Sequence, residues 1–367
     1  MPTLPLLNRP PHAPRLATLD ALRGVAALAV AWFHFTNGTP GFLDDGLLKT
    51  SGARGWLGVE AFFVISGFII PYSLHKGRYR LQRHWKVFVA KRLIRLDPPY
   101  IACIVLVVAL QYASSLAPGY RGQPPHYSWT QLALHLGYLN AYFGGTWVNP
   151  VFWTLAIEFQ FYLLIALLYP LLSDRRAWVR LSCVSVLAAM SISFPATNLV
   201  FQWLGLFGLG IISFQFFVGL TDRTTYFVAL AAMTMVCYSV LGAMITAVGL
   251  AAALAITFLR IRRTTLLSLL GAISYSVYLL HVPVGGRVIN LGMRLSPTLL
   301  NRSLTLAAAV VVTVLAAYVF YRIVELPAQK WSARIKYNPE MDARLTNEPT
   351  PTLSLDPQSA LGHSPIK

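Results

Sequence analysis

Long apolar segments separated by short polar ones make up most of the first 331 residues of the chain. A bilayer core about 30 Å thick requires about 20 apolar residues per helix, so runs of about 17 to 25 residues are the expected unit. Ten segments have this character and predict an all-α, polytopic integral membrane protein with about ten transmembrane helices. The predicted spans are residues 19–37, 56–74, 99–116, 151–172, 178–194, 198–220, 226–241, 244–261, 266–291 and 304–325.

An eleventh apolar segment, residues 129–143, is short and contains several polar side chains. We expect it to be interfacial or re-entrant, because a further crossing would invert every later loop. With ten spans and the amino terminus inside, 22 of the 30 Lys and Arg residues lie on the inner side and five in outer loops. This distribution follows the positive-inside rule. It predicts a multi-pass protein of the inner (cytoplasmic) membrane with both termini cytoplasmic.

The composition agrees with a membrane location. Hydrophobic residues account for 56% of the chain and charged residues for 12%, and the mean hydropathy is +0.57. Average soluble domains carry about 25% charged residues. The net charge of +17 could indicate nucleic-acid binding or basic cytoplasmic loops. The positions of the basic residues favour the loops, and no nucleic-acid-binding motif accompanies them.

The predicted membrane domain covers residues 19–331 and is flanked by two polar segments. Residues 1–18 are expected to form a cytoplasmic N-terminal segment. Residues 332–367 are expected to form a disordered cytoplasmic tail, because polar residues and Pro replace aliphatic ones there. The first apolar run is too long for a cleaved signal peptide. Neither disulfides nor a metal site are expected, because the cysteines lack paired spacing and lie in apolar stretches.

Ionisable side chains inside the spans are functional candidates, because charge is costly to bury in a bilayer. Arg23 and His34 lie eleven residues apart in the first span, which places both on one helix face about 16 Å apart. They could be a cation for an anionic ligand and a proton-transfer group at one cavity, or a snorkelling arginine and a hydrogen-bonded histidine. Asp20 could cap this helix and hold the Arg23 guanidinium. The other ionisable candidates are Glu60, Glu158, His281, Arg287, Arg322 and Glu325.

Six sequence blocks, in order, resemble those of the acyltransferase family 3 membrane proteins. The first is Leu-Asp-Ala-Leu-Arg-Gly, which precedes His34, and the fourth has the pattern Trp…Glu…Phe-Tyr. The resemblance covers about residues 16–331, with Ala21 and Ala61 as departures that we treat as neutral and Asp97 as one that dilutes the basic loop. The blocks are residues 19–24, 58–68, 91–100, 152–163, 271–283 and 321–327.

The resemblance implies a ten-span membrane-bound O-acyltransferase. Such an enzyme takes an acyl group, commonly acetyl, from cytoplasmic acyl-CoA and passes it to a hydroxyl of a carbohydrate, a polysaccharide precursor or another acceptor. Acyl-CoA would be a donor substrate, and no permanently bound cofactor is expected. Some relatives carry an additional soluble hydrolase-like domain. The length of this chain predicts that it acts alone or with a separate biosynthetic partner protein.

Given this resemblance, Arg92 and Arg95 are the candidates for binding the phosphates of CoA. They lie one turn apart if the segment is helical, and guanidinium groups bind phosphate oxygens bidentately. Arg23 would help to orient the pantetheine arm. The alternative is that these arginines only provide positive-inside charge or contact anionic lipids.

His34 is the candidate general base, because neutral imidazole accepts a proton near pH 7 and the residue lies in the outer half of its span. The acceptor hydroxyl would attack the acyl carbonyl directly, and an acyl-histidine intermediate is a second route. Glu158 would orient the imidazole or the acceptor, or form a structural pair with an arginine or a tyrosine. A cationic or tyrosyl donor would stabilise the oxyanion.

Supporting roles are expected for Asp20, Glu60, Tyr278, His281 and Glu325. His281 precedes Pro283, so we expect a kinked helix with a carbonyl freed nearby. We expect Ser66 to bond its own backbone rather than act as a nucleophile. An outer aromatic segment, residues 118–150, is a candidate acceptor-binding region or an interfacial belt. It contains, among others, Tyr120, His126, Tyr127, Trp129, Tyr142 and Trp147.

A transporter or flippase is the alternative function, since Arg, His and Glu side chains in a membrane can also bind a substrate or relay protons. It predicts no dependence on acyl-CoA. The sequence does not select the acceptor, and it does not distinguish acetyl from succinyl or longer donors.

Overall fold

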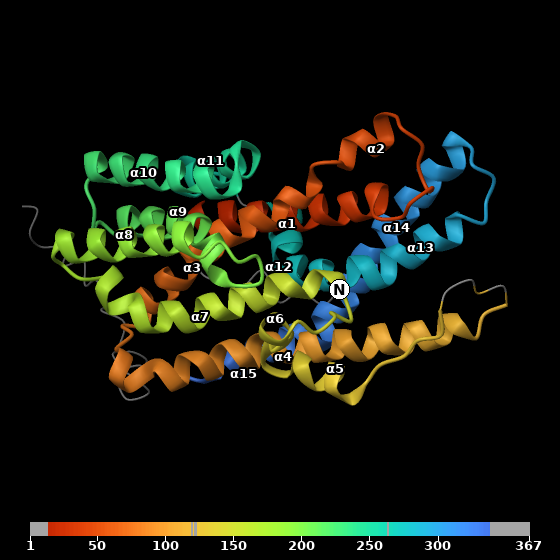
Figure 1. The fold of residues 1–367 in the computed structure, drawn as a ribbon, viewed down its shortest axis with the longest axis horizontal. Coiled ribbons are helices and arrows are strands. Elements are labelled where there is room, and N and C mark those ends of the chain that lie inside the picture. The colour runs from red at the N-terminus through yellow and green to blue at the C-terminus, as the bar shows by residue number, and fades with distance from the viewer. Residues whose placement is uncertain (1–13, 119, 121–122, 263, 338–367) are drawn as a thin grey trace, which may run out of the picture.

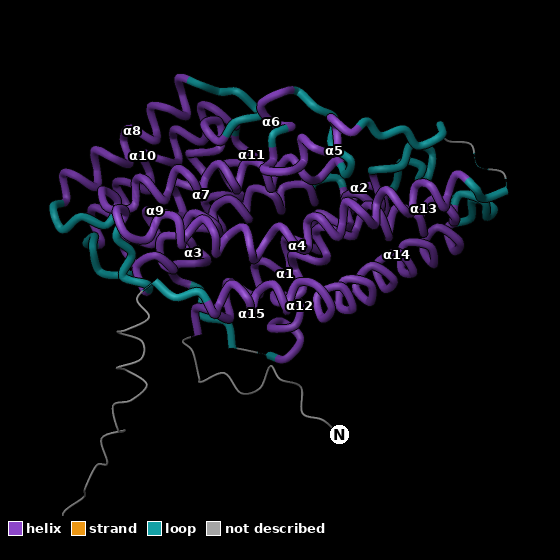
Figure 2. The backbone as a smooth tube through the Cα atoms, turned by 90° about the horizontal axis from the view of Figure 1, so that it is seen from below, coloured by secondary structure: helices purple, strands orange, loops and turns teal. Residues whose placement is uncertain are grey.

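The structure, a computed structural model, describes residues 14–118, 120, 123–262 and 264–337, and this part of the chain is helical without strands. Figure 1 shows most of the long helices running side by side along the long axis, and Figure 2 shows the same bundle from below. The elements are α1 (Pro14–Asn37), α2 (Leu47–Gly52), η1 (Gly55–Leu57), α3 (Gly58–Lys76), α4 (Leu81–Ser115), α5 (Trp129–His135), η2 (Leu136–Tyr138), α6 (Asn140–Phe143), η3 (Pro150–Phe152), α7 (Trp153–Leu172), α8 (Ala177–Ser193), η4 (Val200–Trp203), α9 (Leu204–Phe217), α10 (Arg223–Leu241), α11 (Ala243–Phe258), α12 (Thr265–Leu280), η5 (His281–Gly285), α13 (Gly286–Gly292), α14 (Leu299–Phe320), η6 (Tyr321–Glu325) and α15 (Leu326–Arg334).

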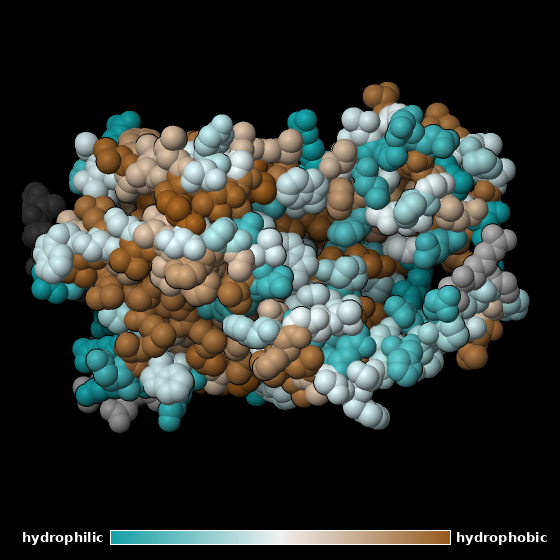
Figure 3. Space-filling model, viewed as in Figure 1, coloured by the Kyte–Doolittle hydropathy of each residue, from teal (hydrophilic) through white to brown (hydrophobic). Residues whose placement is uncertain are grey.

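Each of the ten predicted spans coincides with a helix or with helical elements in direct succession. Within the described residues, seven helical stretches are long and apolar enough to cross a membrane, and α8 and α11 are shorter apolar helices. These features confirm an all-α, multi-pass membrane protein, whereas the number of ten crossings stays a prediction. Figure 3 shows hydrophobic side chains over much of the left and centre of one face and hydrophilic ones gathered toward its right end.

Helix α4 begins at Leu81, well before the predicted span at residue 99. The basic segment is therefore helical and continuous with the apolar part, and Pro98 and Pro99 lie inside the helix. The segment 129–143 forms only the short helices α5 and α6, which are separated by Gly137 with a φ of 71°. Seven residues of helix extend about 10 Å, which is too short to cross a bilayer.

Two expectations at the chain ends need correction. Helix α1 begins at Pro14, so Asp20 lies inside the helix and is not its cap. The disordered tail does not begin at residue 332, because α15 continues to Arg334 and the Tyr337 ring packs 6.2 Å from that of Tyr79. Residues 1–13 and 338–367, which hold the rest of the predicted terminal segments, lie outside the described residues.

Glycines allow the helices that position the cavities to approach closely. Helix α1 packs along α12, and α3 packs along α9. A Cβ atom at Gly271 would lie 2.5 Å from Asp20 Cβ, and one at Gly67 would lie 2.2 Å from the Phe207 carbonyl oxygen. Both distances are shorter than van der Waals contact, so any larger residue would force the helices apart.

The substitution Gly67→Ala is expected to destabilise the fold by about 1–3 kcal/mol, because the backbone of α9 cannot yield as a flexible side chain would. Thermal unfolding in lipid nanodiscs measures the effect. Gly46→Ala is the matched control, since a Cβ atom there meets nothing within 4 Å. Equal thermal midpoints for the two variants would contradict close packing of α3 on α9.

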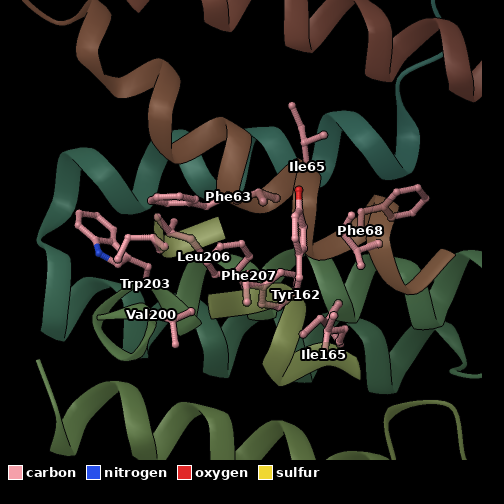
Figure 4. Packing of buried hydrophobic residues seen from close by; sticks show 14 of the residues in the cluster. Phe63, Ile65, Phe68, Tyr162, Ile165, Val200, Trp203, Leu206 and Phe207 are labelled. Atoms are coloured by element: carbon pink, nitrogen blue, oxygen red, sulfur yellow. The ribbon is translucent and has the colours of Figure 1, made fainter. Parts of the chain in front are cut away.

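Aromatic side chains fill the space between α3, α7 and α9. The rings of Phe161 and Phe207 stack with centroids 4.0 Å apart, and Phe63 lies 5.0 Å from Phe207. Figure 4 shows Phe63 and Phe207 in this core, with the Tyr162 hydroxyl directed away from Ile165. This aromatic core packs behind the faces of α3 and α7 that line a cavity with many polar residues.

Candidate active site

A cavity of about 360 Å³ lies between α1, α3, α4, α7, α12 and η6. On α3 it is lined from Val59 to Lys76, so it extends about 25 Å along that helix axis. Its polar and ionisable lining residues are Arg23, Ser66, Tyr72, Ser73, Lys76, Arg92, Arg95, Thr154, Glu158, Tyr162, Ser274, Tyr275, Tyr278 and Glu325. We call it the arginine cavity.

Three predicted arginines meet in this cavity. Arg92 and Arg95 lie on α4, which confirms that their segment is helical, and Arg23 reaches the cavity from α1. The Arg92 Cζ atom lies 5.3 Å from the centroid of the Tyr162 ring, a distance suited to a cation–π contact. Lys76 also lines the cavity, so one end of it carries four basic side chains.

Lys91 belongs to the same basic segment but has a different role. Its Nζ atom donates to the Ser332 carbonyl at 2.9 Å and to the Ile335 carbonyl. Ser332 Oγ in turn donates to the Lys91 carbonyl at 2.8 Å. Lys91 therefore joins α4 to α15. Its neighbour Arg92, in contrast, lines the cavity.

Glu158 lies in the arginine cavity and accepts a hydrogen bond from Ser66 Oγ at 2.8 Å. Ser66 thus bonds a carboxylate across two helices, and the expectation that it bonds its own backbone is wrong. Tyr162, one turn along α7, lines the same cavity. The Glu158 carboxylate therefore shares one cavity with the three arginines, and the attraction between opposite charges there offsets part of the free-energy cost of burying them.

Glu325 is a second buried carboxylate at this cavity. It lies in η6, a π-helical turn, and is 2% exposed. Its oxygens accept from Ser276 Oγ at 2.5 Å and from Gln329 Nε2 at 2.9 Å. These bonds link α12 to α15, so Glu325 serves both the packing of the two helices and the charge of the cavity.

Tyr278 lies on the wall of the arginine cavity that is distant from Lys76. Its hydroxyl is 2.7 Å from Thr154 Oγ1 and 3.3 Å from the Val151 carbonyl. The ring of Tyr278 lies 5.7 Å from that of His281, which lines a different cavity. Tyr278 and His281 therefore stand between two cavities.

The second cavity has a volume of about 390 Å³ and contains His34. The His34 and His281 ring centroids are 5.0 Å apart. We call it the histidine cavity; its polar and ionisable lining residues are His34, Thr39, Gln111, Ser114, Tyr120, His281, Arg287 and Asn290. These hydroxyl, amide and phenol groups can both donate and accept hydrogen bonds, which suits a ligand with hydroxyl groups.

The backbone around His281 confirms the predicted distortion. Residues 281–285 form a π-helical turn, and Pro283 leaves the Leu279 carbonyl without its helical donor. That carbonyl accepts instead from Asn149 Nδ2 at 3.1 Å and from Cys103 Sγ at 3.4 Å. The contacts tie α12 to α4 and to the start of α7.

The hydrogen bonds of His281 define which ring nitrogen carries a proton. His281 Nδ1 lies 3.2 Å from the Val277 carbonyl, which can only accept, so Nδ1 holds the hydrogen of the neutral ring. Its Nε2 atom is buried and has no hydrogen-bond partner among the described residues. That nitrogen is therefore able to accept a hydrogen bond.

The structure separates some residues that the sequence grouped together. Arg23 and His34 were expected at one cavity, but Arg23 lines the arginine cavity and His34 the histidine cavity. Glu158 was expected to orient the imidazole or the acceptor, or to pair with an arginine or a tyrosine. In the structure it bonds Ser66 in the arginine cavity, and the ring beside His34 is that of His281.

The other ionisable residues of the spans have varied surroundings. Glu60 is buried at the start of α3, and its Oε2 has no hydrogen-bond partner within the described chain. Arg287 lines the histidine cavity and donates to the Pro283 carbonyl at 2.6 Å. Arg322 is exposed. The outer aromatic segment also divides, since Tyr120 lines the histidine cavity and Trp129 is 86% exposed.

Sequence reasoning overlooked several cavity residues that helical spacing could have identified. Thr154 and Tyr162 lie one turn before and one turn after Glu158, so all three share a face of α7. Ser73 and Lys76 similarly lie one turn apart on α3. A polar residue repeated at this spacing inside an apolar helix is the signal that would have found them.

The sequence was compared with known families and proteins. The profile of acyltransferase family 3, described as an acyltransferase domain, matches residues 16–322. This chain belongs to acyltransferase family 3. The matched range includes Arg23, His34, Arg92, Arg95 and Glu158, so most of the residues that line both cavities lie within it.

Individual relatives of this family 3 chain are distant. The O-acetyltransferase OatA of Staphylococcus aureus is 31% identical over 45% of this chain and 26% of its own length. A putative acetyltransferase, ORF330, of Acidianus two-tailed virus is 28% identical over 55% of this chain and 58% of its own. The regulator of hypoxia-inducible factor 1 of Caenorhabditis elegans is 31% identical over 37% and 28%. The chain thus spans only part of these relatives, and no solved structure matches it.

Proposed function

We propose that this protein is a membrane O-acyltransferase that moves an acyl group, in the simplest case acetyl, from acyl-CoA to a hydroxyl acceptor. The observation that carries the proposal is the pair of cavities that meet at Tyr278, His281 and His34. One cavity is lined by three arginines and a lysine, and the other by two histidines, one arginine and several neutral polar side chains. Two substrates of different chemistry, brought together at a shared wall, are what a transfer reaction requires.

The arginine cavity is the proposed donor site. Arg92 and Arg95 would hold the phosphates of CoA, and Arg23 would orient the pantetheine arm toward Tyr278. The positive-inside distribution of the loops supports a cytoplasmic opening at Lys76, with both termini on that side of the inner membrane. Acyl-CoA is present in the cytoplasm, so the donor would enter from the end where the basic residues gather.

The histidine cavity is the proposed acceptor site, and His34 the general base. The acceptor oxygen would attack the thioester carbonyl carbon as His34 takes the hydroxyl proton. Collapse of the tetrahedral intermediate would break the carbon–sulfur bond, and the proton would pass to the departing CoA thiolate. The Tyr278 hydroxyl lies on the wall between the sites, where it can donate to the developing oxyanion.

Release of free CoA thiol tests the proposal directly. The purified protein in lipid nanodiscs is mixed with acetyl-CoA and extracted cell-envelope glycans, and thiol is followed with a chromogenic reagent. We expect release that requires the protein, the donor and the acceptor together. Absence of thiol release, combined with movement of the glycan across the bilayer of sealed proteoliposomes, would replace the enzyme by the transporter alternative.

Mass spectrometry of envelope glycans from cells with and without the gene would then identify the acceptor. Loss of an acyl group at a defined hydroxyl would give the acceptor, the position and the length of the acyl chain in one comparison. A polysaccharide or glycoconjugate precursor with free hydroxyl groups is the acceptor class that we propose for the histidine cavity.

A further inference from the structure

A third cavity, of about 410 Å³, lies at the start of α7 and is separate from the two that the proposed reaction uses. All of its lining residues are uncharged. They include three tryptophans, two asparagines and a threonine, namely Trp147, Trp153, Trp203, Asn140, Asn198 and Thr197. We call it the tryptophan cavity.

The three tryptophans come from different parts of the fold. Trp147 precedes η3, Trp153 begins α7 and Trp203 ends η4. The rings of Trp153 and Trp203 have centroids 5.5 Å apart and an interplanar angle of 41°. Flat aromatic faces of this size offer a large contact area to the CH groups of a sugar ring and lose little side-chain entropy on binding.

The polar side of the cavity is held in place by Gln160. Its Nε2 donates to the Asn198 carbonyl at 3.2 Å, and its Oε1 accepts from the Val200 N–H at 2.8 Å. Gln160 is 7% exposed and lies on α7. The segment that carries Thr197 and Asn198 is therefore fixed to the same helix as Trp153, so the polar and aromatic walls keep their separation.

The Asn140 amide provides the most specific observation. Asn140 is 2% exposed, and its Oδ1 atom is buried without a hydrogen-bond partner among the described residues. A Cβ atom built on Gly145 would lie 2.1 Å from this oxygen, so the amide points to the glycine-lined side of the cavity. A buried polar atom without a partner costs free energy unless a ligand or water satisfies it.

The neighbouring histidine shows what such a ligand must provide. Burial lowers the pKa of His135, so its ring is neutral and carries one hydrogen. Nδ1 donates that hydrogen to the Gln131 carbonyl at 2.8 Å, and Nε2 accepts from the Val148 N–H at 3.0 Å. Asn140 Nδ2 lies 3.1 Å from Nδ1, so the opposite amide orientation, with Oδ1 toward that N–H, satisfies this contact better.

Either amide orientation leaves one polar atom of Asn140 directed at the cavity, a donor in one case and an acceptor in the other. A hydroxyl group satisfies both, because it donates and accepts. The absence of lining charge among these described residues disfavours an ionised ligand, whose desolvation would go uncompensated. Together with the aromatic faces, the geometry points to a neutral carbohydrate as the ligand of the tryptophan cavity.

The tryptophan cavity lies close to the proposed acceptor site. Trp147 lines the tryptophan cavity and Pro150 lines the histidine cavity. Three residues of chain span at most about 11 Å. A linear glycan of several rings could therefore occupy both cavities at once. The claim that this glycan is also the acyl acceptor rests on the proposed function. The claim that a carbohydrate binds in the tryptophan cavity does not.

Isothermal titration calorimetry in lipid nanodiscs tests the inference without any acyl donor. The probes are maltotetraose, cellotetraose and chitotetraose, and nanodiscs avoid detergents with sugar headgroups. We expect saturable binding of at least one probe. Trp147→Ala should weaken it about tenfold and Asn198→Ala about threefold, as expected for the loss of one aromatic contact and one hydrogen bond.

Trp178→Ala is the matched control, because Trp178 lies on α8, is 65% exposed and does not line the cavity. It should leave the dissociation constant unchanged, and all variants should keep the thermal midpoint of the parent protein. Asn198 is exposed, so its variant tests the site even if Trp147→Ala fails to fold. No saturable binding of any probe, or equal weakening by Trp178→Ala, would overturn the inference, irrespective of acyl transfer.

Discussion

The variant His34→Ala is expected to lose acyl transfer by about 10²- to 10⁴-fold, the usual contribution of a positioned general base. His34 lines the proposed acceptor cavity beside His281, so its removal takes away the proposed acceptor of the hydroxyl proton. The measurement is the initial rate of CoA thiol release at saturating acetyl-CoA. The Michaelis constant for acetyl-CoA should change little, because the arginine cavity is left intact.

His75→Ala is the matched control for this substitution. His75 is exposed near the end of α3 and does not line either cavity, so its variant should retain the parent rate. Acid-quenched samples analysed by intact mass spectrometry would detect an acyl-histidine on the parent protein if the covalent route operates. A folded His34→Ala variant with the full parent rate would exclude both routes through this residue.

The double substitution Arg92→Ala with Arg95→Ala is expected to raise the Michaelis constant for acyl-CoA by roughly 100-fold. Each charge-assisted hydrogen bond to a phosphate contributes about 1.5–3 kcal/mol, which is at least about a tenfold effect per arginine. The Michaelis constant for the acceptor should stay near its parent value, since the acceptor would bind in the histidine cavity. Initial rates over a matrix of donor and acceptor concentrations separate the two constants.

Lys86→Ala controls for the general loss of basic charge. Lys86 lies on the same helix and is exposed, so it adds to the positive surface without lining the cavity. Its variant should differ from the parent only at low ionic strength, where long-range attraction of an anionic donor is strongest. An unchanged donor constant in the double arginine variant would mean that Arg92 and Arg95 serve topology or lipid contact instead.

The fold was predictable from sequence where the bilayer imposes a simple rule. The length and apolarity of each segment were enough to predict a helix at each span. Backbone N–H and C=O groups in lipid must bond to one another, and a helix is one of the few structures that allows this. The start of α4 at Leu81 was not predictable this way, since a basic segment carries no apolar signal. The same rule failed for Asp20, because α1 extends into the polar segment before it.

The site was only partly predictable because helix periodicity places residues on a face but does not identify the helix opposite. Spacing correctly put Arg23 and His34 on one face of α1. It gave no indication that Tyr278 and His281 of the α12–η5 unit lie between two cavities along that face. The partner of Glu158 was likewise missed, because Ser66 reaches it from a helix 92 residues away in the sequence.

Hydrogen bonds from Lys91 connect the end of α15 to the part of α4 that lines the proposed donor site. Ser332 and Ile335 supply the carbonyls that hold the Lys91 ammonium, and Arg92 is the next residue on α4. A protein shortened to end at residue 331 would retain every residue that lines the three cavities. It would nevertheless lose the two carbonyls that accept hydrogen bonds from the Lys91 ammonium, so the end of α15 contributes to holding the helix that carries Arg92 and Arg95.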